Sequence, residues 1–597
     1  MNTTGFIKGI IANLLLIEPQ GEVRQNEICY ISADDQGQTL IAEVIKISGK
    51  TVYAQVFDST RGIKSGAKVT FSGSMLEVAL GPGLLSKNFD GLQNDLDKLE
   101  GLFLQRGQQA YPLDTACLWA FEPLAQPGAA IQAGYWLGEV QEHGLPHKIM
   151  APFTLTNEPH TLQWIAPAGN YTITDTIAVL TNQNGAQIPV TMVQPWAVKT
   201  PLKAYRQKIR PGQLLQTGIR ILDTLHPIMK GGTGFIPGPF GCGKTVLQQA
   251  IAKQADADVV VVAACGERAN ELVDIFTEFP ELIDPRTGKQ LIERTVIIGN
   301  TSSMPVSARE ASVYTAMTIC EYYRNMGLSV LLLADSTSRW AQALREMANR
   351  LEDLPGPDAY PVDLPAVISN FYARAGMVEL YNQHTGAITF VGTVSPAGGN
   401  FKEPVTEATK KATRCFYALS QRRADSKRYP AIDPIESYSK YIEYPEFARY
   451  IAPIAGNTWL AEVQELKNIL LQGKDAADQI NILGDDGVST DFHLHFWRAE
   501  LLDFVLLQQD AFDAIDQLTP LNRQQYMTRL CLTICRQFLT FDDFVQVRSF
   551  FKKLINALRQ MNYTPFQSDE FNHYNTEALE MLQGHQLLQG DAPVAGN

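Results

Sequence analysis

The spacing of hydrophobic residues divides the chain into regions of different predicted structure. Between residues 1 and 76, short apolar segments such as 9–17 and 42–47 are separated by Gly, Asp and Ser turns. This close spacing of apolar segments predicts an N-terminal β-barrel. A linker is expected over 77–110, and residues 111–190 form a second β-rich stretch that we interpret as an inserted unit.

Strand and helix patterns alternate over residues 191–435. The expected strands are 258–265, 295–299, 328–334 and 387–393, and an expected helix is 307–326. Such alternation predicts strand–helix–strand units and a mainly parallel sheet. After Pro434 the strand patterns end, and helical apolar spacing predicts an all-helical domain over 436–597. We therefore expect a multidomain α/β protein.

The length and composition are those of a globular protein with several domains. The 597 residues exceed the size at which a single hydrophobic core stops growing, and 45% hydrophobic with 19% charged residues is ordinary. The sequence contains no apolar run long enough for a membrane span and no secretory signal pattern, so we expect a cytoplasmic protein. The net charge of −13 disfavours nucleic acid as a partner.

A phosphate-binding loop is the strongest chemical signal. The residues Gly238-Pro239-Phe240-Gly241-Cys242-Gly243-Lys244-Thr245 fit the pattern G-x-x-x-x-G-K-[ST]. In such a loop, backbone N–H groups surround a triphosphate, the lysine balances its charge, and the hydroxyl ligates Mg²⁺. An apolar segment precedes the loop, and a helical pattern begins at Val246, as a strand–loop–helix requires. The chain is predicted to bind a nucleoside triphosphate.

Cys242 lies inside this loop, near the start of the predicted helix. Because a helix N-terminus can lower the pKa of a thiol, our hypothesis is that Cys242 is reactive and that its oxidation blocks nucleotide binding. The other cysteines lack metal-ligand spacing and are expected to be reduced and buried.

Acidic residues end two of the predicted apolar strands. Asp335 ends the strand 328–334 in the manner of a Walker B segment, where a carboxylate holds Mg²⁺ or its water shell. Glu267 and Arg268 follow the strand 258–265, where a carboxylate can polarise water and a cation can meet charge on the γ-phosphoryl group. On these residues alone, a helix cap for Asp335 and an ordinary surface pair for Glu267 and Arg268 remain open.

Several segments carry a family resemblance. They are Gly238–Thr245, Gly266-Glu267-Arg268, Asp335-Ser336-Thr337-Ser338-Arg339-Trp340-Ala341, Ser395-Pro396-Ala397-Gly398-Gly399 and Glu403-Pro404-Val405-Thr406. With them, nearly the whole chain resembles the catalytic A subunit of V-type (A/V-type) rotary ATPases. The resemblance implies a RecA-like P-loop ATPase core, and it equates the insert at 111–190 with the bulge of those subunits.

The resemblance also implies roles for individual residues. Lys244 and Thr245 would hold phosphates and Mg²⁺, with Asp335 as a further metal residue, and Glu271 would lie in the outer metal shell. Glu267 would act on the hydrolytic water. The remaining implied contacts are Arg268 and Arg339 near the γ-phosphate, and Tyr429 and Phe512 as aromatic walls on adenine.

The partners implied by the resemblance are the subunits of a rotary complex. ATP or ADP would be bound at the interface with a B subunit, in an alternating hexamer, and the B subunit would donate an arginine finger in trans. A central rotor stalk and peripheral stalks would couple the chain to H⁺ or Na⁺ transport in a separate membrane sector, placing it at the cytoplasmic face of a membrane. Two other hexameric P-loop ATPases are alternatives: an export ATPase of the type III or flagellar kind, and a Rho-type RNA translocase.

Overall fold

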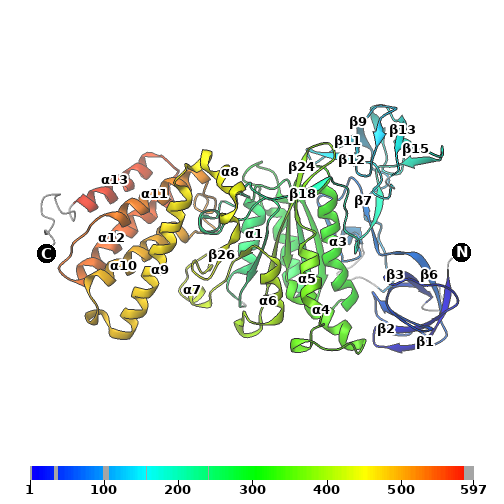
Figure 1. The fold of residues 1–597 in the computed structure, drawn as a ribbon, viewed down its shortest axis with the longest axis horizontal. Helices are drawn as coiled ribbons and strands as arrows, with labels where there is room; N and C mark the ends of the chain where they lie inside the picture. Colours follow the sequence, from blue (N-terminus) through cyan, green and yellow to red (C-terminus); the bar gives the residue numbers. More distant parts are fainter. Residues whose placement is uncertain (1–2, 33–37, 99–105, 156–157, 240, 584–597) are drawn as a thin grey trace.

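The computed structural model describes residues 3–32, 38–98, 106–155, 158–239 and 241–583. A β-barrel and a β-rich insert lie at one end of the elongated molecule, a central sheet flanked by helices lies in the middle, and a helical domain lies at the other end (Figure 1). This is the multidomain α/β architecture that the hydrophobic pattern predicts, and the expectation of the fold class is confirmed.

The N-terminal barrel is closed, with strand order β1-β2-β5-β4-β3-β6. Its strands are β1 (Thr4–Ile11), β2 (Leu14–Pro19), β3 (Glu27–Ser32), β4 (Thr39–Ser48), β5 (Thr51–Val56) and β6 (Lys68–Met75). The segment 9–17, expected as one apolar stretch, is split by a turn in which Ala12 has a φ of 52°. Residue Ile11 therefore pairs with Leu14 across a hairpin. Apolar content did not reveal this turn because Ala12 is apolar and Asn13 is the single polar residue of the stretch.

The insert consists of two four-stranded sheets, with orders β10-β13-β15-β16 and β12-β11-β9-β14. Its strands are β9 (Trp119–Pro123), β10 (Ala130–Ile131), β11 (Trp136–Glu142), β12 (Leu145–Met150), β13 (His160–Ile165), β14 (Gly169–Tyr171), β15 (Ala178–Asn182) and β16 (Gln187–Val190). Within 77–110, β7 (Glu77–Leu80) pairs with β17 (Gln194–Ala197), and β8 (Lys87–Phe89) extends the central sheet beside β21. This segment is more than a connecting linker.

The central sheet runs in the order β26-β25-β19-β24-β22-β20-β21-β8, with β23 and β18 continuing from β24. Its strands beyond β8 are β18 (Gln207–Ile209), β19 (Thr233–Pro237), β20 (Val259–Glu267), β21 (Thr295–Thr301), β22 (Ser329–Asp335), β23 (Gly376–Glu379), β24 (Thr385–Val394), β25 (Cys415–Phe416) and β26 (Tyr438–Ser439). The strands β19, β24, β22, β20 and β21 are mutually parallel. The short strand β26 lies beyond Pro434, where no strand was expected.

Both faces of the central sheet are buried, which explains its continuous apolar strands. Alternate residues of β20 from Val259 to Cys265 pack with α3 on one face, and those between them pack with α1 and α2 on the other. The helices of this region are α1 (Lys244–Gln254), α2 (Ala269–Glu278), α3 (Val306–Arg324), α4 (Thr337–Arg350), α5 (Leu364–Tyr372), α6 (Pro404–Ala412) and α7 (Gln421–Asp425).

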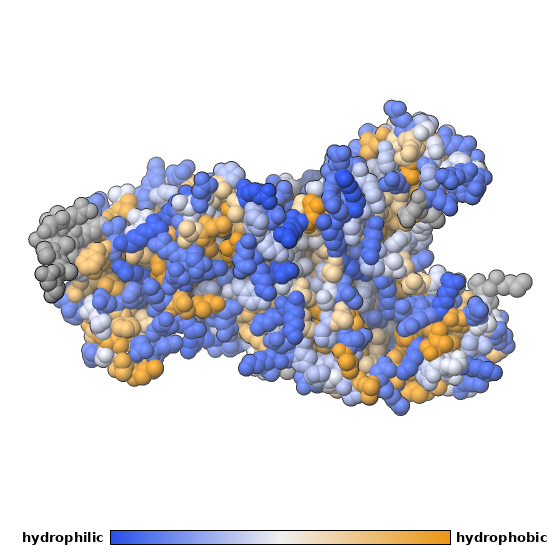
Figure 2. Space-filling model, in the orientation of Figure 1, coloured by the Kyte–Doolittle hydropathy of each residue, from blue (hydrophilic) through white to orange (hydrophobic). Residues whose placement is uncertain are grey.

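The C-terminal domain is helical. Its α-helices are α8 (Pro445–Ala455), α9 (Trp459–Leu483), α10 (Thr490–Leu501), α11 (Leu521–Arg536), α12 (Phe544–Asn562) and α13 (Asp569–Gln583). A π-helical segment, Leu502–Leu507, continues α10, and a second one, Ile221–Leu225, precedes β19. Figure 2 shows a mainly hydrophilic surface with apolar patches on the barrel and at the lower tip of this domain. Exposed apolar residues at these places include Ile11 on the barrel and Ile482 at the end of α9.

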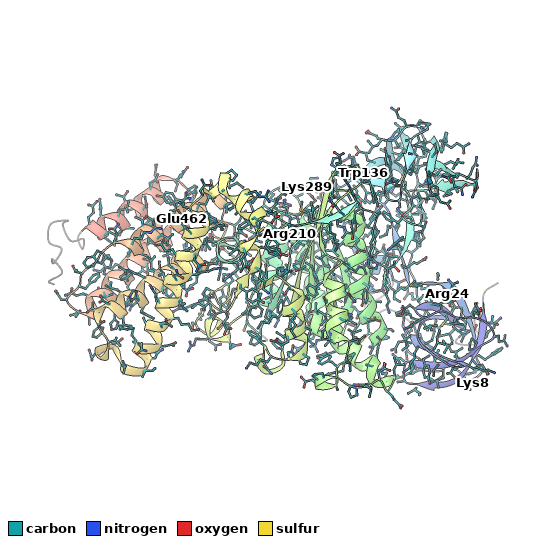
Figure 3. The ribbon with its side chains drawn as sticks, viewed as in Figure 1. Lys8, Arg24, Trp136, Arg210, Lys289 and Glu462 are labelled. Atoms are coloured by element: carbon teal, nitrogen blue, oxygen red, sulfur yellow. The ribbon has the colours of Figure 1, made fainter. Side chains whose placement is uncertain are left out.

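The insert is anchored by a buried hydrogen-bond chain. Glu142 Oε1 accepts bonds from the backbone N–H of Gly83 (2.8 Å) and Leu85 (3.0 Å). Its other oxygen lies 2.6 Å from His147 Nδ1, and His147 Nε2 lies 2.9 Å from the Tyr322 hydroxyl on α3. Trp136, labelled in Figure 3 where the insert meets the sheet, donates from Nε1 to the Asn325 carbonyl at 3.0 Å.

The barrel is tied to the core by a largely buried ion cluster. Lys199 Nζ, on the segment after β17, lies 2.9 Å from a carboxylate oxygen of Glu43 on β4 and 3.2 Å from one of Glu310 on α3. Burial raises the pKa of Glu43, while the Lys199 ammonium opposes that rise. The two carboxylates therefore depend on a single cation.

Replacing Lys199 with methionine should lower the thermal midpoint, because it leaves two buried carboxylates without their cation. Removing one partner of a buried pair typically destabilises by about 3–5 kcal/mol. The matched control is Lys8→Met, which removes an exposed pair with Glu18 on the barrel (Figure 3) and should change stability by less than about 1 kcal/mol. Equal midpoints for the two variants would contradict the role of the cluster.

Candidate functional site

The phosphate loop joins β19 to α1. Gly241 and Gly243 both have a φ of 83°, and Gly243 caps the N-terminus of α1. This left-handed backbone favours glycine and turns successive N–H groups toward the loop interior. The Lys244 ammonium folds back over the loop and donates to the carbonyl oxygens of Gly238 (2.7 Å) and Pro239 (3.0 Å). Phe240 lies outside the described residues.

A cleft of about 750 Å³ opens beside this loop. It brings together Lys244, Thr245, Glu267, Glu271 and Asp335. Glu267 ends β20 and Asp335 ends the adjacent strand β22, and the two strands are parallel. Parallel strands end at the same edge of a sheet. Asp335 therefore lies beside the phosphate loop, although about 90 residues separate the two in the sequence.

Arginine side chains complete the cleft. Arg268 and Arg339 both line it, Arg268 from the N-cap of α2 and Arg339 from the first turn of α4. Arg339 Nη1 also donates to Gln342 Oε1 at 3.3 Å. The predicted carboxylate and cation residues are thus gathered around one opening with most of the phosphate loop, whereas Gly238 and Cys242 do not line it.

The carboxylates of the cleft are partly desolvated. Burial, with the nearby charges of Asp335 and Glu271, raises the pKa of Glu267 to about 8, and Arg339 opposes the rise. Burial also raises the pKa of Asp335, although a hydrogen bond from the Thr393 hydroxyl (2.5 Å) and the Lys244 charge oppose it. Burial lowers the pKa of Lys244, against the pull of the same carboxylates. Within the described part of the chain, Glu267 Oε1 is buried without a hydrogen-bond partner.

A second pocket of about 510 Å³ adjoins the loop on its other side. Tyr429 and Phe512 line it, and it shares Gly241, Gly243 and Val246 with the phosphate cleft. The two openings therefore adjoin the same part of the loop. A flat apolar group carried on a phosphate chain can be bound across both.

Several residues of these pockets were not predicted from the sequence. They are Thr393, Lys427, Gln508, Arg559, Asn562 and Tyr563. The position of Thr393 near the end of an apolar strand was a usable signal, since other strand ends of the same sheet carry site residues. The rest come from the helical domain and from a loop before it, and no local pattern connects them with the phosphate loop.

The lowered pKa that the sequence led us to expect for the Cys242 thiol is not found, and the effect of its oxidation on nucleotide binding stays a hypothesis. The side chain is 1% exposed, and its Sγ donates to Gln421 Oε1 at 3.2 Å. Burial raises the pKa of the thiol, and the charge of Lys244 offsets this only in part. Desolvation is thus the dominant influence on the pKa of this thiol.

Two wider features bear on ligands and location. Among the residues that the structure describes, no three His, Cys, Asp or Glu side chains are grouped closely enough to hold a metal by themselves. In the same residues, no helix is both long enough and apolar enough to cross a bilayer.

Family models match the chain in the order of its structural regions. The beta-barrel domain of the ATP synthase alpha/beta family matches 9–73, and the barrel-sandwich domain of the alpha/beta subunit matches 110–199. The nucleotide-binding domain of the same family matches 218–439, and the C-terminal domain of V and A type ATP synthase matches 452–544. The fold and site are therefore those of a P-loop subunit of the ATP synthase alpha/beta class.

Comparison with similar proteins identifies the family within this class. The V-type ATP synthase alpha chain of Borrelia recurrentis is 46% identical over 595 residues, which covers 98% of this chain and 100% of the relative. The V-type ATP synthase alpha chain of Borreliella burgdorferi is 46% identical over 591 residues, with 98% and 100% covered. The chain belongs to the family of V-type ATP synthase alpha chains, and the resemblance drawn from its motifs is confirmed.

The pH dependence of stability should reflect the buried state of Glu267. Its pKa rises from 4.5 to about 8 on folding, so the folded protein retains a proton that the unfolded chain has lost, and stability falls as pH rises through this window. We expect the thermal midpoint of the wild type to fall more between about pH 5 and about pH 8 than that of Glu267→Gln, which cannot ionise.

The control is Glu278→Gln, which changes an exposed glutamate at the end of α2 and should follow the wild-type curve. Parallel curves for the wild type and Glu267→Gln would contradict the raised pKa.

Proposed function

We propose that this chain is the catalytic subunit of a rotary ATPase, hydrolysing or synthesising ATP in the cleft beside the phosphate loop. The observation that carries the proposal is the meeting of Lys244, Glu267 and Asp335 at one edge of the sheet. A subunit that only binds nucleotide needs no water-polarising carboxylate, and Glu267 has a buried oxygen free of other bonds within the described residues.

In this proposal ATP or ADP lies across the phosphate loop. The N–H groups of Gly241–Thr245, at the N-terminus of α1, bind the phosphates, and the Lys244 ammonium exchanges its two loop carbonyls for phosphate oxygens. The base enters the second pocket, where Tyr429 and Phe512 stack on it. Val246 contributes to both openings.

The cleft also suits Mg²⁺. Thr245, Asp335 and Glu271 offer a hydroxyl and carboxylates, the hard oxygen ligands that this ion takes. The lack of a three-residue acidic or histidine cluster among described residues agrees with an ion held by one or two protein groups and by substrate phosphates. When bound, the ion would neutralise charge on the β- and γ-phosphates.

Glu267 would orient the attacking water and accept its proton. With a pKa of about 8, it carries a proton at neutral pH in the free chain and is then a poor base. Cations close to the cleft favour its ionised form, as Arg339 already does. Lys244, Arg268 and Arg339 would meet the negative charge that develops on the γ-phosphoryl group.

A further cation would come from a neighbouring subunit. We propose that a B subunit closes the cleft in an alternating hexamer and donates an arginine finger. Rotor and peripheral stalk subunits would couple turnover to H⁺ or Na⁺ transport by a membrane sector, with this chain held at the cytoplasmic face and no nucleic acid involved. The insert and the helical C-terminus, both matched by family models, do not favour the export ATPase or the Rho-type translocase.

Glu267→Gln should retain ATP binding and lose most turnover in the assembled A–B complex. The amide keeps the size of the side chain but cannot accept the water proton, and loss of such a group typically lowers the rate by about 10²–10⁴-fold. Steady-state hydrolysis and equilibrium nucleotide binding would measure both effects. Lys244→Ala is the comparison variant and should lose binding itself. Unchanged turnover in Glu267→Gln would remove this residue from the mechanism.

The isolated chain should hydrolyse ATP slowly, and addition of its B partner should raise the rate. An arginine finger is worth about 10³–10⁵ in rate. The measurement is magnesium-dependent ATP hydrolysis by the chain alone and by the reconstituted A–B hexamer at equal active-site concentration. Equal rates would refute the donation of a catalytic group in trans.

A further inference from the structure

The loop that carries Phe512 is held by its backbone and not by the packing of that ring. Phe512 is 86% exposed, so hydrophobic contacts within the chain do not fix its position. The loop runs from Gln508 to Thr519, between the π-helical end of α10 and the start of α11. A wall for a nucleotide base requires this loop to be held in place before the ligand arrives.

One fully buried guanidinium binds both ends of the loop. Arg220 is 0% exposed and immediately precedes the π-helical segment Ile221–Leu225, in the region that leads to β19. Its Nε donates to the Leu506 carbonyl at 2.9 Å, just before the loop, and its Nη2 donates to the carbonyl of Gln508, the first residue of the loop. Its Nη1 donates to the Asp516 carboxylate and, at 3.0 Å, to the Thr519 hydroxyl, at the end of the loop.

A chain of hydrogen bonds continues from Arg220 to Phe512. Asp516, 3% exposed, binds Arg220 through Oδ1 and accepts the Asp510 N–H through Oδ2 at 2.7 Å. Asp510 Oδ1 in turn accepts the Phe512 N–H at 2.9 Å. The orientation of the turn at Phe512 therefore depends on the ion pair.

The same network reaches the opposite wall of the pocket. The Arg220 N–H donates to Gln509 Oε1 at 2.8 Å, and the Gln509 N–H donates to the Tyr429 carbonyl at 2.9 Å. Gln509 Nε2 donates to the Gly218 carbonyl at 2.9 Å. The positions of Tyr429 and Phe512 thus both depend on the buried hydrogen-bond cluster around Arg220, which joins the nucleotide-binding region to the helical domain.

We infer that Arg220 is a positioning residue for the base subsite, acting through Asp516 to hold Phe512, and through Gln509 to hold Tyr429, in the wall of the pocket that both residues line. It sets the affinity for the base and leaves the phosphate subsite alone. This inference rests on the proposed function, in which the pocket between Tyr429 and Phe512 receives the base.

The test compares two ligands on the full-length chain: magnesium ATP and magnesium tripolyphosphate, which has no base. Arg220→Met and Asp516→Asn should weaken ATP binding by about five- to a hundred-fold, the range of base stacking. Tripolyphosphate binding should remain as in the wild type. Phe512→Ala should give the same pattern, and the combination Phe512→Ala with Asp516→Asn should be less than additive, because both changes remove one interaction.

A folding defect is separated from positioning in two ways. Asp516→Asn keeps the size of the side chain but loses its charge and one acceptor oxygen, and the double variant Arg220→Met with Asp516→Leu leaves no unpaired charge. Bound tripolyphosphate reports that the nucleotide-binding region is folded. In the double variant, a normal thermal midpoint together with weakened ATP binding would support positioning.

Other results would overturn the inference. Wild-type ATP affinity in Arg220→Met and Asp516→Asn would do so, as would an equal loss for ATP and tripolyphosphate. A failure of the proposed function gives a different pattern: Phe512→Ala would leave ATP binding unchanged, or Lys244→Ala would bind both ligands normally.

Discussion

The register of four parallel strands is the constraint on which the site depends. In β19, β24, β22 and β20 the ladder pairs Pro237 with Val394, Ala334 with Gly392, and Ala264 with Asp335. This fixes the carboxyl ends of the strands at one edge, where the phosphate loop begins and where the acidic residues emerge. A slip of one residue in β22 would turn Asp335 to the other face of the sheet. The apolar strand interiors, buried on both faces, make such a slip costly.

The charged side chains of the site lie where they are largely shielded from solvent. Three carboxylates lie near one lysine, and burial moves the pKa values of Glu267 and Asp335 upward and that of Lys244 downward. Burial thus disfavours the charged forms of Glu267, Asp335 and Lys244. Because opposite charges interact more strongly in such surroundings than in water, a ligand with both phosphates and a cation relieves this imbalance. Under the proposed function, this burial would favour a ligand that carries both phosphates and a cation.

The local elements of the site could be predicted from the sequence, but the tertiary contacts could not. Strand periodicity and the loop motif predicted β20, β22 and β24, together with the acidic residues that end β20 and β22, because both signals are contained in short segments. The turn at Ala12 was hidden by its apolar residue, and the environment of Cys242 depends on Gln421, far along the chain. Tyr429 and Phe512 entered only through the family resemblance. Arg220 gave no signal, since an arginine beside an apolar segment normally predicts an exposed position.

The division of the site between two regions has a thermodynamic consequence. The phosphate loop belongs to the central sheet, while Phe512 belongs to a loop of the helical domain, and the Arg220 cluster fixes their relation. A nucleotide that contacts both favours the arrangement in which both contacts form together. The two effects are linked thermodynamically. If bound nucleotide opposes displacement of the helical domain, that displacement must weaken nucleotide binding by the same factor. A buried ion pair suits this purpose better than apolar packing, because its hydrogen bonds have fixed directions and transmit a small rotation of the helices to the base.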